Sequence, residues 1–551
     1  MPRCLCSGIV TKPSASWMWC RMTGRSLISF VSTKQGAQVT SIRESAGNGS
    51  IRLSESIGAH ILYVVAVAAF AAALPPGAYV SVGTGVIGAI GILAMWRYGW
   101  GMLHFVRALI FRKVVFPGQR KAADEAVKHD PPNTFLLVTT FRIDSAVTTR
   151  VYRAAFEAAL AAPGKATVVA SIVEAGDQRL IKSLYQAICG DQDKVDLVIV
   201  RIAGTGKRDA LAYGFRAVAR RAPAPDDVVA VIDGDSIVPR DLVQKCVGFF
   251  QLDPKVGALT TDEMSEVRGS RIFQEWYALR FAQRHTLMSS VGLSERVLTL
   301  TGRMSMFRAS IVCNPEFIRQ VELDYVDHWR LGRFKFLTGD DKSSWFYLLR
   351  NGYKMLYVPD IVVLTVEDPP SENFVSAAAM LMVRWFGNML RTNSRALALG
   401  PRKIGLFTWW SILDQRMSMW TSLVGFFVVL LAGIFISGYA FLLYAIWILT
   451  TRYILTLSLL ASRQRVSVFY PFLLYFNQIF GSLIKVHVTF RLDRQKWTRQ
   501  KTTSANVAKR PLIASNFMSA CMHSVALIAF VSVLAWGMNV LPTPSPLFFL
   551  P

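Results

Sequence analysis

The sequence predicts an α/β domain with a mostly parallel sheet, inserted between α-helical transmembrane segments. Three observations predict this fold class: long uncharged apolar stretches lie near both ends of the 551-residue chain, short β-branched runs alternate with alanine-rich stretches between them, and carboxylates directly follow one of these runs. The chain has 52% hydrophobic residues and a mean hydropathy of +0.35, which exceeds ordinary soluble usage. It is therefore predicted to be an integral membrane protein.

Residues 1–55 are predicted to be a disordered extension. They carry basic residues, serine, threonine and glycine without a sustained hydrophobic period, and the apolar stretch around Trp17 and Trp19 is too short to cross a membrane. We expect Met18 or Met22 to serve equally well as the real start, because this tract adds nothing that the later chain needs. The fold prediction therefore begins after it.

Residues 56–112 are predicted to form a transmembrane helical hairpin. No Asp, Glu, Lys or Arg lies between residues 55 and 97, and Pro75-Pro76-Gly77 divides this stretch into two segments of membrane-spanning length. The connection between the segments is uncharged, whereas the flanking tracts are basic. The positive-inside rule therefore places the N-terminus and the following domain in the cytoplasm.

Residues 417–551 are predicted to form further transmembrane and interfacial helices. An uncharged run covers 417–451 and is long enough for one span and much of a second, which continues to residue 461. The apolar segment 466–484 has basic residues on both sides, so it is predicted to lie at the interface without crossing. A last span is predicted near 517–540, which brings the total to about five.

Residues 113–375 are predicted to be the α/β domain. Its β-branched runs predict strands at 135–140, 167–173, 195–201 and 228–232, and its alanine-rich stretches predict helices at 148–161 and 210–221. Alternation of this kind indicates a mostly parallel sheet with helices on both faces, whose ligands bind at the carboxyl ends of the strands.

The predicted strand 228–232 delivers two carboxylates to that edge, Asp233 and Asp235, with Gly234 between them. Hard oxygen ligands at this position suit Mg²⁺ or Mn²⁺ held against a diphosphate. Taken alone, an Asp-Gly turn that closes the strand explains the same residues equally well. The pair is a metal-site prediction only in combination with the other motifs.

A second motif precedes it, where two glycines lead into Lys207 and Arg208 at the start of a predicted helix. Backbone amides and two cations at a helix start favour phosphate. The spacing differs from the P-loop, which needs four residues between its glycines and a Ser or Thr after the Lys. A solvated helix start is the alternative.

A third motif, Asp340-Asp341, follows Thr338-Gly339 and leads into an aromatic helix that ends near Gly352. Adjacent carboxylates at a helix start cap the helix and suit its dipole, which is the structural explanation. The functional explanation is that one of them accepts a proton from an attacking hydroxyl.

Residues 376–416 are predicted to be interfacial amphipathic helices that carry Arg384-Trp385. The aromatic and basic pattern suits a helix seated on anionic lipid. Its arginines, including Arg391 and Arg395, are also suited to a diphosphate or an acidic sugar, because a guanidinium pairs with either in a bidentate manner.

Composition excludes other classes. The seven cysteines are scattered without a CxxC pair or a His/Cys cluster. We therefore expect no zinc site, and we expect the soluble domain to lie in a reducing compartment. Lys and Arg outnumber Asp and Glu by 61 to 36, a formal net charge of +25. With so much of the chain assigned to membrane segments, this charge is expected to serve membrane lipid and anionic substrates, and no nucleic acid.

Together and in this order, the motifs resemble those of the processive family 2 glycosyltransferases, which include cellulose, chitin and hyaluronan synthases. In that family a Gly-Lys-x-x-Ala-Leu segment precedes DxD, then an acidic motif ending in the catalytic Asp, then Gln-x-x-Arg-Trp. The matching positions here are Lys207, Asp235, Asp341 and Arg384. Leu381 replaces the Gln, which argues against cellulose or chitin synthases, and the stretch from Arg384 resembles the mannuronan synthases that polymerise alginate.

The resemblance implies a GT-A-like domain and inverting transfer of mannuronate from GDP-mannuronate to a growing β-1,4 chain, with export through the same protein. It implies Asp341 as the base beside Asp340, Asp233 and Asp235 as holders of Mg²⁺ or Mn²⁺, and a multi-pass protein of the bacterial inner membrane. A cyclic-di-GMP-binding co-polymerase is the expected partner, because this chain shows no such domain.

The candidates for binding the substrate or nucleotide form a wider set. They are Asp233, Asp235, Lys207, Glu174, Asp177, Lys342, Arg384, Trp385 and Arg391, with Arg303 and Arg308 as further candidates for a sugar carboxylate. Arg452 lies inside an apolar predicted span, where a cation is costly. It either lines a polymer channel or reaches back to the membrane interface.

Three alternatives stay open at this point. One is a polymerase of another sugar nucleotide, such as a UDP-hexose or UDP-hexuronate. Another is a non-processive transferase that glycosylates a lipid carrier, although such enzymes usually lack the Arg384-Trp385 segment and the later spans. The third is a transporter or scaffold with an inactive transferase domain.

Overall fold

The computed structural model describes residues 52–80, 84–127, 131–190, 193–497, 502–503 and 512–541. The predicted extension lies outside the described residues apart from its last few, where Leu53–Glu55 forms a short 3₁₀ turn. Residues from Leu53 onward form one compact unit, which is the subject of everything below.

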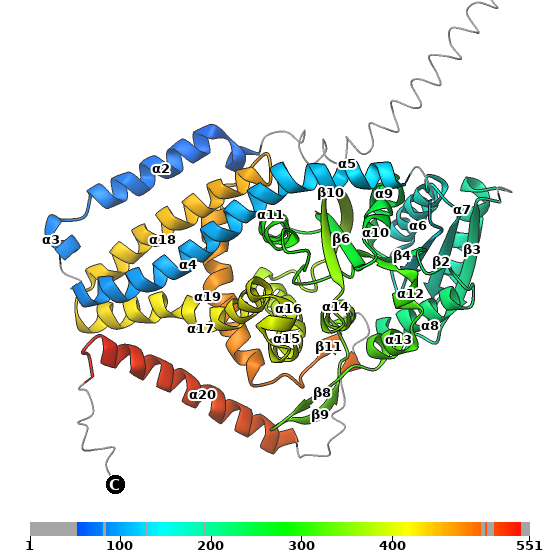
Figure 1. The fold of residues 1–551 in the computed structure, drawn as a ribbon. Coiled ribbons are helices and arrows are strands. Elements are labelled where there is room, and N and C mark those ends of the chain that lie inside the picture. Colours follow the sequence, from blue (N-terminus) through cyan, green and yellow to red (C-terminus); the bar gives the residue numbers. More distant parts are fainter. Residues whose placement is uncertain are drawn as a thin grey trace, which may run out of the picture. The chain divides into compact units, whose positions relative to one another are not determined.

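One mixed sheet of eight strands organises the central part of the chain, in the order β3-β2-β1-β4-β7-β6-β10-β5 (Figure 1). Its strands are β1 Thr134–Thr139, β2 Ala166–Ile172, β3 Val195–Arg201, β4 Val228–Asp233, β5 Ser236–Ile237, β6 Val256–Val267, β7 Met304–Arg308 and β10 Lys354–Glu367. Only β7 and β5 run antiparallel to their neighbours. The prediction of a mostly parallel sheet is confirmed, and the four predicted strands appear with ends shifted by at most one residue.

The parallel strands are buried apolar runs, as in sheets covered by helices on both faces. All six residues of β1 are buried, and β4 is buried except at Asp233. The helices that connect and cover these strands are α6 Ser145–Leu160, α7 Ala175–Ile188, α8 Lys207–Ala219, α13 Pro315–Glu322 and α14 Asp340–Arg350. Their apolar faces and the strands share one continuous hydrophobic core.

The register brings the carboxyl ends of the parallel strands to one edge. Thr139, the last residue of β1, is level with Asp233 on one side and with Ser171 on the other. Ile172 at the end of β2 is level with Arg201 at the end of β3. The loops that leave these strands therefore meet at a single edge, where ligands bind in open α/β sheets.

Long apolar helices form the other part of this unit. Among the described residues, three helices are long and apolar enough to cross a membrane: α17 Leu406–Phe435, the span Tyr439–Ala461 that contains α18 Tyr439–Ser458, and the span Asn516–Gly537 within α20 Leu512–Gly537. Beside them lie α2 Ile57–Ala72 and α4 Thr84–Ile110. Figure 1 shows α2, α18, α4 and α17 running next to one another, and the packing of α18 on α2 and of α17 on α4 agrees.

The described helices that meet the membrane-spanning criterion are fewer than the predicted crossings. Helix α2 has 16 residues, or about 24 Å at 1.5 Å per residue, short of the hydrocarbon core. Helix α4 is long enough but carries Arg97 and Arg107. The chain also stays helical beyond it, through the π-helical turn Phe111–Val115 and α5 Phe116–Ala126.

Three further helices connect the sheet to the membrane helices. Helix α11 Arg271–Gly292 packs on α4 and on β6, and α15 Phe374–Ala398 packs on α14, α17 and α19 Tyr470–Thr489. A buried polar cluster strengthens this connection, because Asp262 of β6 forms an ion pair with Arg463 after α18 at 2.8 Å and lies 3.0 Å from Nδ1 of His285 in α11. Strand β6 is therefore held directly against the helical bundle.

Candidate active site

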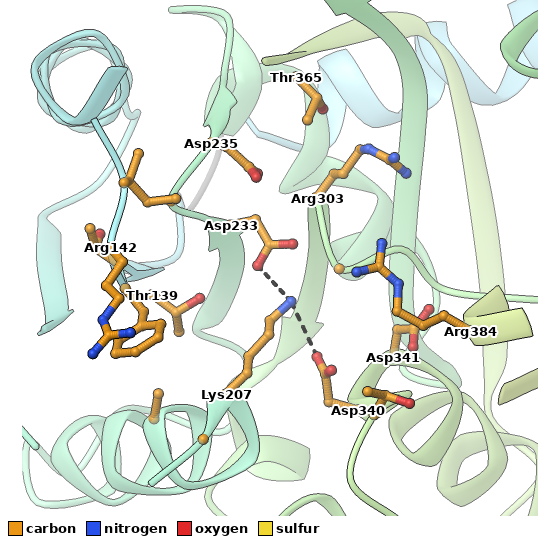
Figure 2. Close-up of a pocket in the computed structure, with 18 of the residues that line it drawn as sticks. Thr139, Arg142, Lys207, Asp233, Asp235, Arg303, Asp340, Asp341, Thr365 and Arg384 are labelled. Carbon is orange, nitrogen blue, oxygen red and sulfur yellow. Dashed lines mark ion pairs between the residues drawn. The ribbon is translucent and has the colours of Figure 1, made fainter. Parts of the chain in front are cut away.

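A cavity of about 610 Å³ opens at the carboxyl edge of the sheet. Its walls come from the loops after β1, β3, β4 and β10, the starts of α8 and α14, and the middle of α15. Figure 2 shows Asp233, Asp235, Lys207, Asp340, Asp341 and Arg384 gathered around this space. Motifs that are far apart in the sequence therefore meet in one place.

The Asp233-Gly234-Asp235 turn is fixed by a close backbone approach. A Cβ on Gly234 would lie 2.7 Å from the carbonyl oxygen of Thr139, so only glycine lets the two strand ends come this near. The backbone N–H of Asp233 donates to the carbonyl of Arg303 at 3.1 Å, and the carbonyl of Asp235 accepts from Val366 at 2.9 Å. Both carboxylates are consequently held at the edge of the cavity.

Lys207, the first residue of α8, joins two of the acidic motifs. Its Nζ lies 2.5 Å from Asp233 Oδ1 and 3.4 Å from Asp340 Oδ2, as the dashed lines in Figure 2 show. Burial alone lowers the pKa of Lys207, but the charges of Asp233 and Asp340 outweigh it and raise the pKa above its ordinary value. Lys207 is therefore charged and bridges the DxD turn and the start of α14.

Burial also acts on Asp233, and the charges of Asp235 and Asp340 act in the same direction. Together they raise the pKa of Asp233 to about 6, against the opposing effect of Lys207. A bound ligand that excludes water from this cluster would strengthen the effect of these charges on the pKa of Asp233.

The backbone at Gly339 positions the third motif. Gly339 has a φ of +83° and packs against Asn388 of α15, where a Cβ would lie 2.9 Å from the amide carbon of that side chain. Helix α14 then begins with Asp340 and Asp341 in its first turn. Burial acts to raise the pKa of Asp340, but the charges of Lys207 and Arg208 outweigh burial and lower that pKa. Burial and the charge of Asp340 both raise the pKa of Asp341. One acid of the pair is thus shifted toward proton acceptance nearer neutral pH.

Helix α15 contributes Arg384 and Trp385 from the side facing the membrane helices. The guanidinium of Arg280 stacks on the Trp385 ring, 3.5 Å from its centroid, and Trp276 lies 5.8 Å away at a tilt. Trp276 in turn donates from Nε1 to Asn477 of α19 at 2.7 Å. The aromatic wall of the cavity is therefore anchored to the helical bundle.

The sequence-based prediction missed several residues that line the cavity. They are Thr139 to Asp144 after β1, Gly302, Thr365 to Asp368 at the end of β10, and Asn388. Arg142 stands out among them because it has a φ of +48°, a strained backbone conformation that often marks a functional loop. The predicted strand end near residue 140 was a usable signal for the first group, but the long strand β10 offered none.

Arg303, a predicted carboxylate receptor, lines the cavity but already has acidic partners. Its two terminal nitrogens lie 3.3 Å from Glu263 and 2.5 Å from Glu367. These charges, with Asp235, raise its pKa despite burial, which acts the other way. Arg303 is held in place rather than available as an isolated cation.

Other predicted residues lie away from the cavity lining. Glu174 is exposed at the start of α7, and Asp177 lies one turn further on. Lys342 is buried and donates to the carbonyl of Leu298 at 2.7 Å, while Arg391 is buried and donates to the carbonyl of Leu492 at 3.0 Å. These two cations hold backbone segments together, which a sequence pattern cannot distinguish from substrate binding.

Arg308 has the same kind of structural role. Its side chain is buried, donates to the carbonyls of Val256 and Asp253 and pairs with Asp226 at 2.5 Å. It therefore fastens the end of β7 to the chain around β6.

The donor set suits a magnesium-type ion bound together with a substrate. Within the described residues, no group of three or more His, Cys, Asp and Glu side chains could ligate a metal by itself. Mg²⁺ commonly takes only one or two protein carboxylates and completes its shell with substrate phosphates and waters. Asp233 and Asp235 at a cavity edge fit that pattern.

Comparison with known proteins places these features in a family. Residues 131–388 match the family model described as "Glycosyltransferase like family 2". This segment contains Lys207, both aspartates of the DxD turn, Asp340-Asp341 and Arg384-Trp385.

Similar proteins cover most of the chain. It is 51% identical over 443 residues to "Glycosyltransferase alg8" of Pseudomonas syringae pv. tomato, which spans 80% of this chain and 90% of that protein. It is 47% identical over 484 residues to "Glycosyltransferase alg8" of Azotobacter vinelandii, spanning 88% of this chain and 98% of that protein.

Among solved structures, one similar chain is the mannosyltransferase PcManGT from Pyrobaculum calidifontis in complex with GDP-Man and Mn²⁺. The TM-score is 0.49 with 18% sequence identity, and the match covers 74% of this chain and 98% of that chain.

Proposed function

Since this chain belongs to the family 2 glycosyltransferases, together with the alg8 proteins, we propose that it polymerises mannuronate from GDP-mannuronate into β-1,4-mannuronan, the precursor of alginate, and helps to export it. One observation carries the proposal: the DxD turn, Lys207, the Asp340-Asp341 pair and Arg384-Trp385 all line one cavity beside membrane-spanning helices. A dead scaffold would not require this convergence.

The proposed chemistry is a single displacement with inversion at the anomeric carbon. Asp341 accepts the proton of the acceptor hydroxyl, whose oxygen forms the new bond to the anomeric carbon while the bond to the GDP oxygen breaks. The raised pKa of Asp341 suits this task, because a general base works best when its pKa approaches the operating pH. Asp340 stays ionised beside Lys207 and orients the Asp340-Asp341 pair.

Asp233 and Asp235 would hold Mg²⁺ or Mn²⁺. When bound, the ion offsets the negative charge of the donor diphosphate. Lys207 and Arg384 both line the cavity and would offset the charge that develops on the departing GDP. Trp385 would provide a flat apolar face for the acceptor sugar.

The proposed location is the bacterial inner membrane, with this cavity on the cytoplasmic side, where sugar nucleotides are found. The basic tracts beside the apolar helices favour that orientation and contact with anionic lipid. A cyclic-di-GMP-binding co-polymerase is the proposed partner. Polymer yield should rise when the partner is present, and full activity of the isolated chain would contradict this part.

Donor identity is tested with membranes that contain the full chain and are supplied with GDP-mannuronate, UDP-glucose or UDP-glucuronate. We expect polymer from GDP-mannuronate alone, and a loss of about a thousandfold in rate for Asp341→Asn. Polymer from a UDP sugar would instead establish the alternative donor class. A fully active Asp341→Asn protein would remove the proposed base.

A further inference from the structure

A small hairpin outside the main sheet carries an exposed tryptophan at its tip. Strands β8 Tyr325–His328 and β9 Gly332–Lys335 pair in antiparallel fashion and form a separate two-stranded sheet. Trp329, in the turn between them, is 81% exposed. A single exposed ring is ordinary on a protein surface, so its surroundings have to show whether it serves a purpose.

The base of the hairpin is fixed in the protein. Leu331 and Phe334 are buried and belong to one apolar cluster with Leu390 of α15 and Val488 of α19. Both helices belong to the part of the chain that joins the sheet to the membrane helices. The position of the hairpin is therefore set by packing against these helices, and its tip is carried along with them.

A polar contact places the tip beside a membrane-spanning helix. Arg330, the residue after Trp329, donates to the hydroxyl of Ser519 in α20 at 2.9 Å and to the carbonyl of Phe490 at 2.6 Å. Figure 1 shows the hairpin next to the end of α20 that carries this serine. Since successive Cα atoms are about 3.8 Å apart, Trp329 lies close to the same end of α20.

The depth of Ser519 in a bilayer follows from the length of its span. Asn516–Gly537 has 22 residues, or about 33 Å of helix at about 1.5 Å per residue, which matches the hydrocarbon core of about 30 Å. Ser519 is three residues from the start of the span, where hydrocarbon meets the headgroups. Its neighbours Phe517 and Met518 are exposed, as side chains that face lipid are. Trp329 thus lies at headgroup level, where tryptophan is enriched in membrane proteins.

The hairpin also carries the charge that a lipid surface attracts. Residues 325–335 contain three cations, Arg330, Arg333 and Lys335, and one acid, Asp327. The side chain of Arg333 is 64% exposed, and its pair with Asp327 is long, at 3.7 Å, and open to water, so solvent weakens it. An aromatic ring flanked by cations is typical of elements that lie in the membrane interface.

We propose that the β8–β9 hairpin is a lipid-binding anchor, in which Trp329 lies among the headgroups and Arg333 pairs with their phosphates. The inference does not rest on the donor or the product proposed above. It concerns the segment that leads to the catalytic acids, because the chain leaves β9 at Lys335 and reaches Asp340 five residues later. The hairpin therefore ties this segment to the membrane surface.

The test uses the full chain in nanodiscs of equimolar phosphatidylcholine and phosphatidylglycerol. The variant Trp329→p-benzoylphenylalanine is irradiated, and mass spectrometry identifies what the new side chain contacts. The matched control is Tyr213→p-benzoylphenylalanine, because Tyr213 is an exposed aromatic residue on α8, which packs on β1, β2 and β3. We expect about tenfold more phospholipid adduct at position 329 than at position 213.

Two results would overturn the inference. Adducts of position 329 with another protein, including a second copy of this chain, would assign the tip to a protein interface. A lipid yield as low as that of the control position would leave the tip in water.

The charge of the tip is tested with a matched pair of arginine variants. Arg333→Gln removes a cation of the hairpin, whereas Arg221→Gln removes a partly exposed cation that pairs with Asp196 of β3. We expect Arg333→Gln to lower the ratio of phosphatidylglycerol to phosphatidylcholine adducts at position 329 about threefold or more, and Arg221→Gln to leave the ratio unchanged. An unchanged ratio in Arg333→Gln would remove the proposed pairing with phosphates.

A second measurement needs no unnatural amino acid. Tryptophan fluorescence of the wild type and of Trp329→Phe is compared in nanodiscs of phosphatidylcholine that carries bromine near the headgroup end of its acyl chains. The difference between the two proteins isolates the emission of Trp329, and we expect brominated lipid to quench most of it. Size-exclusion chromatography checks that both proteins are intact. Emission from Trp329 that brominated lipid leaves unquenched would contradict the anchor.

Discussion

The two cavities differ in how their cations are balanced. At the carboxyl edge of the sheet, Lys207 pairs with Asp233 and Asp340, and Arg303 pairs with Glu263 and Glu367. In a second cavity, of about 500 Å³ among α4, α11, α17, α18 and α19, Arg452 and Lys485 donate hydrogen bonds to uncharged groups. The charge of Asp414, which pairs with Arg97, acts on Lys485 without a direct ion pair among the described residues. The same side-chain types therefore serve two different purposes within one chain.

This difference indicates what each cavity is built to do. A closed network of ion pairs fixes carboxylates and cations in place before a substrate arrives, which is the requirement for positioned chemistry. Cations that bond mainly to uncharged groups leave a positive field in the cavity among the helices. The four predictions below test the arrangement at the carboxyl edge of the sheet, beginning with the largest expected effect.

Of these four predictions, the largest effect is expected when the charge that joins the acidic motifs is removed. Lys207→Met leaves Asp233 and Asp340 without their shared cation, so the initial rate of GDP release should fall about a hundredfold or more. Lys207→Arg keeps the charge and should retain part of the rate. If Lys207→Met membranes released GDP at the wild-type rate, the ion-pair network would not serve transfer.

Acid should weaken divalent-cation binding at the Asp233-Gly234-Asp235 turn at a higher pH than it would at an ordinary carboxylate site. Burial, aided by Asp235 and Asp340, raises the pKa of Asp233 to about 6. As the pH falls through that value Asp233 takes up a proton and loses the charge needed to hold a divalent cation, so Mg²⁺-dependent GDP binding should drop about tenfold per pH unit below it. Binding that stays constant down to about pH 4.5 would contradict the shifted pKa.

Two glycine substitutions should separate chemistry from stability. A Cβ on Gly302 would meet Lys207 Nζ at 2.8 Å, and that flexible side-chain end can move away. Gly302→Ala should therefore slow transfer about tenfold by displacing Lys207 while leaving the melting temperature nearly unchanged. Gly234→Ala pushes against the backbone of Thr139, and it should lower the free energy of unfolding by about 1–3 kcal/mol.

Activity and thermal melting are measured on both alanine variants. If Gly302→Ala lowered the melting temperature as much as Gly234→Ala, the side chain of Lys207 would not be moving aside to accommodate the new Cβ. The contrast between a mobile side-chain end and a fixed backbone oxygen would then be wrong.

The smallest effect is expected where the structure places a predicted residue outside the cavity. Glu174 is exposed at the start of α7 and is not part of the lining. Glu174→Gln should change the Michaelis constant for the donor by less than about twofold, as most surface changes have small effects. A larger rise would mean that this acid reaches the nucleotide after all.

Local chemistry explains why part of the site could be read from the sequence. Strand β4 is a continuous apolar run that ends at Asp233, and the turn after it needs a glycine, so both the strand and its carboxylates could be predicted. The helix start at Lys207 and the Asp340-Asp341 pair also carry local signals. Their proximity, however, was only an inference from the order of the motifs.

The roles of individual cations could not be read in this way. Lys342 and Arg391 satisfy backbone carbonyls from distant segments, and Arg303 is committed to two glutamates. A sequence pattern gives the charge of a side chain but not its partner, since that partner comes from folding across long separations. The lining residues at the end of β10 were missed for the same reason.

By itself, the sequence determined the alternation of strands and helices, the apolar helices and the acidic residue types at strand and helix ends, because these depend on periodicity and local backbone preference. Only the tertiary structure decided that Lys207 bridges two acidic motifs and that Arg452 and Lys485 line one cavity among the helices. Charge balance depends on which side chains meet in space, and packing rather than local sequence sets those meetings.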